Sequence, residues 1–296
     1  MFWLFLAAAG VFFLAHTAPF PFLLDRFAPV GSLWRVPGAA SPPTVYLTFD
    51  DGPNPTATPE LLDVLRETGA RATFFLIDTH LTSETAPIVR RMFAEGHAVA
   101  LHSDTRALMV KSPDALADIL TKNADRIEQL AGTRPCRLFR PHAGWRSRSM
   151  YNGLKKIDHQ LVGWSWGMWD FNWYRGRDAQ SIAERLARKV SPGDIIVMHD
   201  GHHVNPRADR QYAVEATRRL VPALAAKGWS FGRLCDPGSE QWSVAAHSNR
   251  HFSAPARSRP AEAGTTRSEE HRRNRRIVRF GPEETERWRC SNPIPS

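Results

Sequence analysis

Short apolar runs and amphipathic segments alternate along the middle of the chain, from Thr44 to Leu234. The apolar runs are rich in branched aliphatic and aromatic residues, as buried strands are, and cover residues 45–49, 73–77, 97–101, 137–140, 161–165, 194–199 and 229–234. The segments between them repeat apolar residues at helical spacing, over 58–67, 87–96, 112–132, 178–190 and 209–228. This alternation predicts a parallel sheet with helices packed against it.

The number of strands indicates which parallel fold to expect. About seven strands are too many for one mononucleotide-binding half, and no GxGxxG motif follows the first strand. A barrel, complete or incomplete, is therefore favoured. Thr58 followed by Pro59 is typical of a helix start, and a glycine follows four of the expected helices, where a left-handed cap is common: Gly69, Gly96, Gly132 and Gly228.

Three divisions of the chain follow from its composition. Residues 1–35 form an apolar signal-like or anchor-like segment, 36–240 a folded domain, and 241–296 a tail without hydrophobic periodicity. The run 2–15 is shorter than the roughly 20 residues that a spanning helix needs. It favours export or membrane association through residues 2–24 over an apolar helix packed on the domain. The orientation stays open, because Arg26 and Arg35 follow the run and argue for a cytoplasmic domain by the positive-inside rule.

The charge is uneven. The chain carries a formal +9, of which residues 247–296 contribute +5 through eleven Arg against six Glu. The domain itself is therefore not expected to bind nucleic acid, and the tail is expected to be disordered. Only three cysteines occur, too few and too far apart for a Cys-rich zinc site. Cys136 and Cys235 are expected to be buried thiols that form no disulfide.

Polar residues gather just beyond the predicted strands. In parallel folds the carboxyl ends of the strands meet on one face, where the chemistry occurs. One aspartate after a strand is often a helix cap, but five strand ends carrying Asp, His or Arg are hard to explain as capping. These residues are Asp50, Asp51, His102, Arg140, His142, Asp170, His199 and Asp200.

These residues lie in five motifs that resemble, in family order, the polysaccharide deacetylase family, the NodB-homology domain of family 4 carbohydrate esterases. The motifs are LTFDDGPN (47–54), GHAVALHSDTR (96–106), FRPHAGWR (139–146), WSWGMWD (164–170) and IVMHDG (196–201). They span about two thirds of the chain. The resemblance implies an α/β fold, a distorted (β/α) barrel, and a hydrolase that removes N-acetyl groups from N-acetylglucosamine-type glycans. It acts on C–N bonds other than peptide bonds.

The resemblance also implies a role for each residue. Asp51 and His102 would bind a divalent metal ion, zinc or similar, and Asp50, held by Arg140, would be the general base. The backbone N–H of Ala143 would stabilise the oxyanion. His199, oriented by Asp170, would be the general acid. Trp169 and His142 are expected to contact the N-acetylated glycan substrate.

One departure from the family pattern bears on the mechanism. The second histidine of motif two is Arg106 here, and a guanidinium has no lone pair for a metal. Three explanations stay open: another ligand such as Asp104 or His142 replaces it, Arg106 supplies the charge without metal, or the chain is a glycan-binding module without chemistry. The base, the acid and both partners are present, which favours an active hydrolase. An interaction protein acting through its basic tail is a further alternative.

Several nearby residues have simpler interpretations. His97 lies five residues before His102 and is expected to be structural. His202 and His203 are expected to be exposed loop residues, and Asp200 a rim or capping residue. Of the tryptophans around motif four, most are expected in the core. The domain is expected to be membrane-associated, secreted or periplasmic.

Overall fold

The computed structural model describes residues 2–16, 32–39, 41–167 and 178–235 of the 296-residue chain. The N-terminal helix α1 (Phe2–His16) exposes large apolar side chains, among them Phe2, Trp3 and Phe5. In the described parts of the chain, no helix combines the length and apolar character needed to cross a membrane. The predicted tail 241–296 lies outside the described residues.

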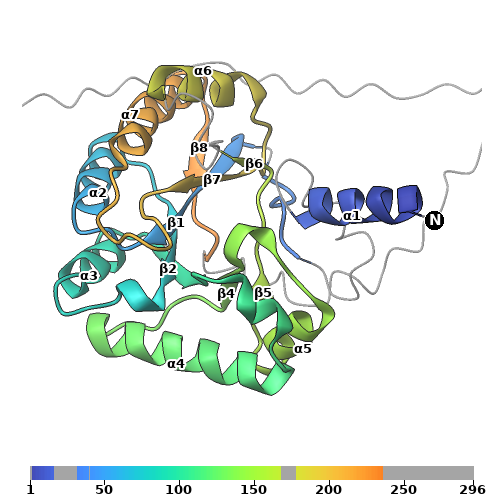
Figure 1. Ribbon diagram of the computed structural model, residues 1–296. Coiled ribbons are helices and arrows are strands. Elements are labelled where there is room, and N and C mark those ends of the chain that lie inside the picture. The colour runs from blue at the N-terminus through green and yellow to red at the C-terminus, as the bar shows by residue number, and fades with distance from the viewer. Residues whose placement is uncertain (1, 17–31, 40, 168–177, 236–296) are drawn as a thin grey trace, which may run out of the picture. The chain divides into compact units, whose positions relative to one another are not determined.

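The domain is built on one parallel sheet, seen at the centre of Figure 1. Its strands are β1 (Thr44–Gly52), β2 (Thr73–Ile77), β3 (Ala98–His102), β4 (Leu138–Arg140), β5 (Gln160–Leu161), β6 (Trp166–Gly167), β7 (Ile195–His199) and β8 (Ser230–Gly232). The spatial order is β5-β4-β3-β2-β1-β7-β6, and β8 pairs with β1. Every strand pair is parallel, so the predicted α/β class and parallel sheet are confirmed.

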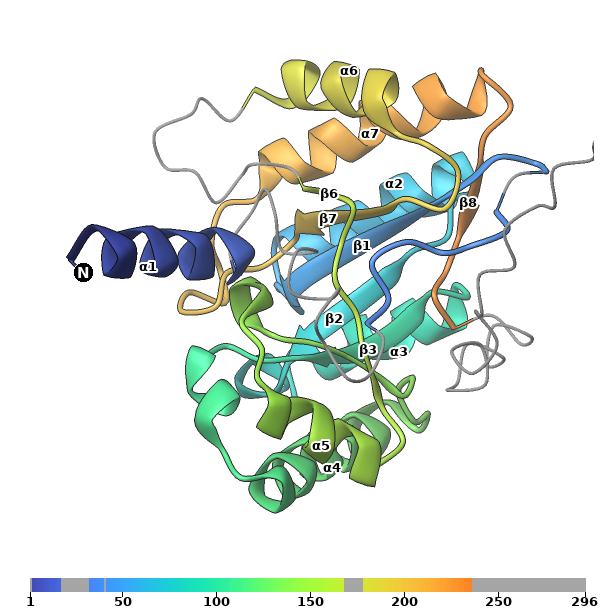
Figure 2. The ribbon, with the colours of Figure 1, turned by 90° about the vertical axis from the view of Figure 1, so that its right-hand side faces the viewer.

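Helices pack in succession around this sheet (Figure 2). They are α2 (Ala57–Thr68), α3 (Ala86–Ala94), α4 (Pro113–Ala131), α5 (Arg148–Lys156), α6 (Ala179–Lys189) and α7 (Gln211–Ala225). Short 3₁₀ turns lie at η2 (Asp78–His80), η3 (Arg106–Val110) and η4 (His142–Gly144). α6 packs on α7, α7 on α2, and α3 and α5 on α4. The helix α5 was not among the segments expected from the sequence.

The predicted strand 161–165 is not a continuous strand: most of it lies between two short strands on opposite edges of the sheet. β5 ends at Leu161 beside β4, and β6 begins at Trp166 beside β7. The chain between them crosses the opening of the curled sheet, where Leu33 pairs with Val162 and Arg35 with Asp194. The segment 33–36 thus lies between the two sheet edges, and the architecture is the distorted barrel expected from the motifs.

The strands are buried on both faces, and alternate residues enter two apolar clusters. Phe74 and Leu76 pack toward the helices, whereas Phe75 between them packs inside the curl with Val162 and Trp164. This period of two is the geometry of a pleated strand. Burial of both faces explains why the strands appear as continuous apolar runs in the sequence.

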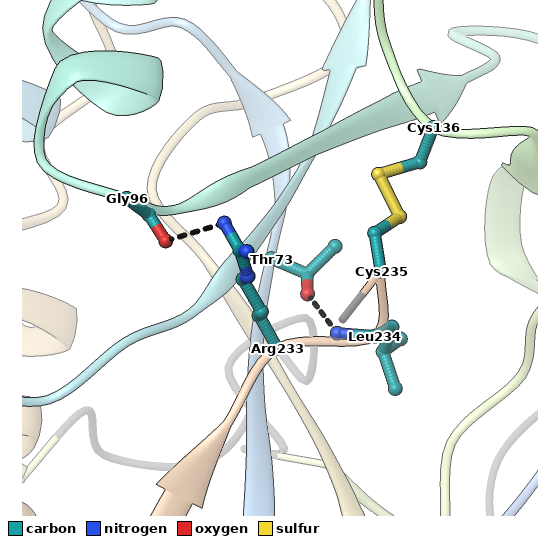
Figure 3. Close-up of a disulfide and its surroundings, with 6 residues drawn as sticks. All are labelled: Thr73, Gly96, Cys136, Arg233, Leu234 and Cys235. Carbon is teal, nitrogen blue, oxygen red and sulfur yellow. Dashed lines mark hydrogen bonds between the residues drawn. A yellow bond between two sulfur atoms is a disulfide. The ribbon is translucent and has the colours of Figure 1, made fainter. Parts of the chain in front are cut away.

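The amino end of the barrel is closed by a disulfide between Cys136 and Cys235, so the expectation of two unpaired thiols is wrong (Figure 3). The Cα atoms lie 6.2 Å apart, and the cysteines are separated by 99 residues. Beside the bond, Leu234 N–H donates to Thr73 Oγ1 at 2.9 Å, and Arg233 Nη1 donates to the Gly96 carbonyl at 3.0 Å. The chain after β8 is therefore fastened to the starts of β2, β3 and β4.

The start of α2 also differs from the expectation. Asn54 Oδ1 accepts hydrogen bonds from the N–H groups of Thr56 and Ala57, at 2.9 and 3.3 Å, so the helix begins before Thr58. Thr58 is buried and its hydroxyl donates to Asp200 instead of capping the helix. At the other end, Gly69 adopts the expected left-handed conformation, with φ of 68°.

Candidate active site

The carboxyl end of β1 carries two adjacent aspartates that face the same way. Neighbouring residues of a regular strand point to opposite faces. Here the pairing of β1 with β2 shifts register between Asp50 and Gly52, and Asp51 has a left-handed φ of 68°. Asp51 Oδ1 and Asp50 Oδ2 consequently lie 3.3 and 4.0 Å from one atom, His102 Nε2. All three side chains are buried.

Two neighbours hold Asp51 in this conformation. His80, a buried residue that the sequence interpretation missed, lies with its Nδ1 3.1 Å from the Asp51 carbonyl oxygen. Gly201 packs so closely that a Cβ built on it would lie 1.8 Å from the same oxygen. A side chain at position 201 would therefore displace the end of β1. This close approach explains why the motif IVMHDG ends in glycine.

Arg140 orients Asp50. The fully buried guanidinium donates from Nη1 to Asp50 Oδ1 at 2.6 Å and to Thr48 Oγ1 at 2.8 Å, and from Nη2 to the Gly163 carbonyl at 2.8 Å. It also lies 4.0 Å from the centre of the Phe75 ring. Asp50 Oδ1 is thus occupied by Arg140, and Oδ2 is left facing His102. Thr48, which lies in the first motif but was given no role from the sequence, is a further positioning residue.

His102 is oriented in the way typical of a metal ligand. Its Nδ1 lies 2.7 Å from the Arg140 carbonyl oxygen, to which an N–H donates, so Nε2 carries the lone pair of the neutral ring. That lone pair faces Asp51 Oδ1, which accepts no hydrogen bond within the described part of the chain. Two lone-pair atoms at this distance require a cation between them, either a proton or a metal ion.

The pKa values of His102 and Asp51 are shifted in the directions that favour a cation between them. Burial lowers the pKa of His102, but Asp50 and Asp51 outweigh it and raise that pKa above the ordinary value. Burial likewise raises the pKa of Asp51, yet the interaction with His102, with a smaller contribution from His199, holds it well below its usual range. The residues therefore fit a divalent ion, which would take the place of the shared proton.

A third metal-ligating side chain lies beside this pair. Asp51, His102 and His142 are the group of such residues, in the described ranges, whose ligand atoms all lie within 4.8 Å of one another. Asp104, the other candidate suggested by the sequence, is not part of it. Burial, reinforced by the charge of His102, lowers the pKa of His142 to about 3, so its ring is neutral and retains a lone pair.

Arg106 lies outside this group. Its side chain is exposed at the start of η3, and its guanidinium carbon is 5.5 Å from the centre of the Trp145 ring. It therefore does not fill the space between the aspartates and the histidines.

Of the remaining predicted site residues, the structure describes His199 and Ala143. His199 ends β7 directly opposite Asp50 in the strand register, which brings acid and base candidates to adjacent strands. Ala143 is half-buried and left-handed, with φ of 53°. Asp170 and Trp169 lie outside the described residues, so their roles stay predictions.

Two expectations near the site were wrong, and one residue was missed. Asp200 is fully buried, not at the rim, and burial raises its pKa to about 7. His202 and His203 are half-buried, and their rings stack with centres 4.6 Å apart. Ser103, which the motif pattern could have identified because it directly follows His102, accepts a hydrogen bond from His142 N–H at 2.9 Å.

Comparison with known proteins identifies the family. A family model described as polysaccharide deacetylase matches residues 38–162. The chain is 30% identical over 210 residues to a peptidoglycan-N-acetylglucosamine deacetylase of Bacillus cereus, across 71% of this chain and 94% of that protein. It is 36% identical over 205 residues to a chitooligosaccharide deacetylase of Sinorhizobium fredii, across 65% of this chain and 90% of that protein.

A solved structure of a related enzyme has a similar fold. A family 4 acetyl xylan esterase from Clostridium thermocellum, in complex with a cobalt ion, superposes with a TM-score of 0.57 at 30% identity, covering 64% of this chain and 88% of that one. The curled parallel sheet, the paired aspartates of β1 and these similarities agree: the chain belongs to the polysaccharide deacetylase family.

Proposed function

We propose that the protein is a hydrolase that removes N-acetyl groups from a glycan of the N-acetylglucosamine type. The observation that carries this proposal is the pair of carboxylates on the bulge of β1. Asp51 Oδ1 and Asp50 Oδ2 both lie within 4.0 Å of His102 Nε2, while Arg140 occupies the other oxygen of Asp50. This geometry separates a metal-binding carboxylate from one able to accept a proton.

In the first step, a water molecule attacks the acetyl carbonyl, and the metal ligands and the general base have separate roles. A divalent ion bound by Asp51 and His102 would lower the pKa of the attacking water and polarise the acetyl carbonyl. Asp50 accepts the proton of that water, and its ion pair with Arg140, 2.6 Å long, fixes the carboxylate for this role. The backbone N–H of Ala143 donates to the oxyanion, for which the left-handed turn at this residue is a suitable support.

The second step needs a proton for the departing amine. His199 donates it, from the end of β7 opposite Asp50, and Asp170 orients its imidazole. His142 would contact the substrate beside the metal ion, and Trp169 would offer an aromatic face to a sugar ring. The activities named for the Bacillus cereus and Sinorhizobium fredii relatives support a peptidoglycan or chitooligosaccharide substrate.

Acetate release tests the proposal. The full chain, loaded with zinc or cobalt, is incubated with chitooligosaccharides and with peptidoglycan, with and without chelator. We expect release that chelation abolishes and that Asp50→Asn lowers by about 10³-fold. Asp104→Asn is the matched control, because Asp104 lies outside the group and should retain activity. Metal-loaded protein that binds oligosaccharide but releases no acetate would identify a glycan-binding module instead.

We also propose that the domain, residues 36–240, works outside the cytoplasm, associated with the membrane through residues 2–24 or secreted. The disulfide supports this, because such bonds persist in oxidising compartments. The apolar surface of α1 supports association with lipid. Fractionation of cells expressing the full chain should find activity in the membrane or exported fraction, and activity confined to the cytosol with both thiols reduced contradicts the proposal.

A further inference from the structure

The loop after β3 provides one metal ligand where the family pattern has two. His102 is present, but the position four residues later holds Arg106. Its guanidinium cannot donate a lone pair. It is exposed, and its guanidinium carbon lies 5.5 Å from the centre of the Trp145 ring. A site built from Asp51 and His102 alone would lack the three protein ligands usual in catalytic zinc sites.

The loop after β4 brings another imidazole to the same place. His142 opens the turn η4, directly after Pro141. Its backbone N–H donates to Ser103 Oγ at 2.9 Å, which fastens the β4 loop to the residue that follows His102. The His142 ring then lies with its centre 6.4 Å from that of His102, and a ligand atom of its ring is within 4.8 Å of those of Asp51 and His102.

We propose that His142 is the third protein ligand of the metal ion, together with Asp51 and His102, and replaces the histidine that Arg106 has displaced. Two imidazoles and one carboxylate are a donor set suited to zinc and cobalt, with a position left open for water or substrate. Asp51 Oδ1, which accepts no hydrogen bond from the described residues, and the orientation of His102 Nε2 by the Arg140 carbonyl both fit such a site. This inference rests on the proposed function, since it specifies the ion that the deacetylase uses.

One neighbour has to be distinguished from His142. The His203 ring centre lies 4.6 Å from that of His142, so His203 is the alternative imidazole closest to it among those described. His202 is already used within its loop, where its Nδ1 accepts hydrogen bonds from the N–H groups of Val204 and Asn205, each at 3.1 Å. His203→Ala is therefore the matched control.

Zinc titration of chelator-treated full chain, followed by calorimetry and by the zinc-induced rise in melting temperature, tests the ligand set. We expect one zinc per chain, an affinity lowered at least about 100-fold by His142→Ala, and a change below about threefold for His203→Ala. The His142→Ala protein should retain the melting temperature of the metal-free wild type, because its N–H to Ser103 is kept. Adding Arg106→His to His142→Ala should restore much of the affinity, since it returns the family's ligand.

Several results would overturn the proposal: wild-type affinity in His142→Ala, an equal loss in His203→Ala, or no zinc binding by the wild type. The two proposals fail separately. Zinc binding that needs His142 without acetate release leaves the ligand set standing and refutes the activity, whereas chelator-resistant acetate release without zinc binding does the reverse.

Discussion

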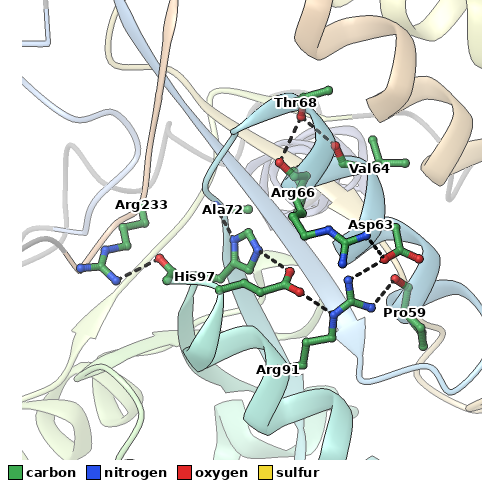
Figure 4. A network of polar contacts seen from close by, with 12 residues as sticks. Pro59, Asp63, Val64, Arg66, Thr68, Ala72, Arg91, His97 and Arg233 are labelled. Carbon is green, nitrogen blue, oxygen red and sulfur yellow. Dashed lines mark hydrogen bonds and ion pairs between the residues drawn. The ribbon is translucent and has the colours of Figure 1, made fainter. Parts of the chain in front are cut away.

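The strand β3 has a buried histidine at each end, and the two histidines behave in opposite ways. His97 precedes the strand and His102 ends it, with 3% and 4% of their surfaces exposed. His97 Nδ1 accepts a hydrogen bond from Ala72 N–H at 3.2 Å, which requires a neutral ring, and burial lowers its pKa to about 4 (Figure 4). His102 faces two carboxylates, which raise its pKa. Equal burial thus gives opposite chemistry, because the partner of each ring decides its charge.

The same contrast holds for the two ends of the barrel. At the amino end, the Cys136–Cys235 bond and the hydrogen bonds of Arg233 and Leu234 fasten the strands together. At the carboxyl end, two non-glycine residues, Asp51 and Ala143, adopt left-handed conformations, and Asp51 Oδ1 lacks a hydrogen bond in the described structure. Two of the three left-handed non-glycine residues in the described structure therefore lie where the chemistry is proposed, and the disulfide lies at the opposite end.

Asparagine substitutions at His97 and His102 should give the largest difference in activity between two matched variants. His102→Asn keeps a donor for the Arg140 carbonyl but removes the ligand atom, so acetate release should fall about 10³-fold and zinc should no longer bind. His97→Asn keeps an acceptor for Ala72 N–H and should retain activity within about threefold. Equal activity loss in both folded variants would remove the distinction between the ends of β3.

Removing the disulfide should have the next largest effect, a loss of stability. Replacing Cys136 and Cys235 together by serine removes a crosslink across 99 residues and should lower the free energy of unfolding by about 3–4 kcal/mol. Urea unfolding of the purified protein measures this loss, and activity at 25 °C should be kept because the bond lies at the end opposite the site. Cys290→Ser is the control and should change neither quantity; a loss of activity without loss of stability would contradict this division of roles.

A pH titration of stability should isolate His97. Its pKa is about 4 when folded and 6.5 in the unfolded chain, so below pH 6.5 the unfolded state binds a proton that the folded state excludes. The free energy of unfolding should therefore fall between pH 6.5 and pH 4, by up to about 3 kcal/mol from this residue. The difference between the wild type and His97→Asn across that range measures it, and parallel curves would show that folding does not change the pKa of His97.

Much of the site could be predicted because its residues lie at strand ends. Asp50, His102, Arg140 and His199 each end or nearly end an apolar run, and parallel pairing brings such ends together. The strand 73–77 was predicted with its observed bounds, since its residues are apolar on both faces.

Features that depend on distant contacts could not be predicted. The run 161–165 is divided between two sheet edges because the barrel opening separates them, which no local pattern records. Cys136 and Cys235 are brought together only by the arrangement of β4 and β8. The proximity of His142 to Asp51 depends on the Ser103 hydrogen bond and on the turn η4, so the sequence could only leave it open as one ligand among several.

Exchanging glycine and alanine at the two ends should give the smallest effect. Gly132 caps α4 with φ of 74° and has open space around it, so Gly132→Ala costs only backbone strain, about 1 kcal/mol of unfolding free energy. Ala143 already has a φ of 53°, and Ala143→Gly relieves comparable strain while making the unfolded chain more flexible. These two terms nearly cancel, so Ala143→Gly should stay within about 0.5 kcal/mol of the wild type in urea unfolding. If Ala143→Gly instead destabilises as much as Gly132→Ala, then the carboxyl end carries no stored strain, and the contrast between the ends rests on charge alone.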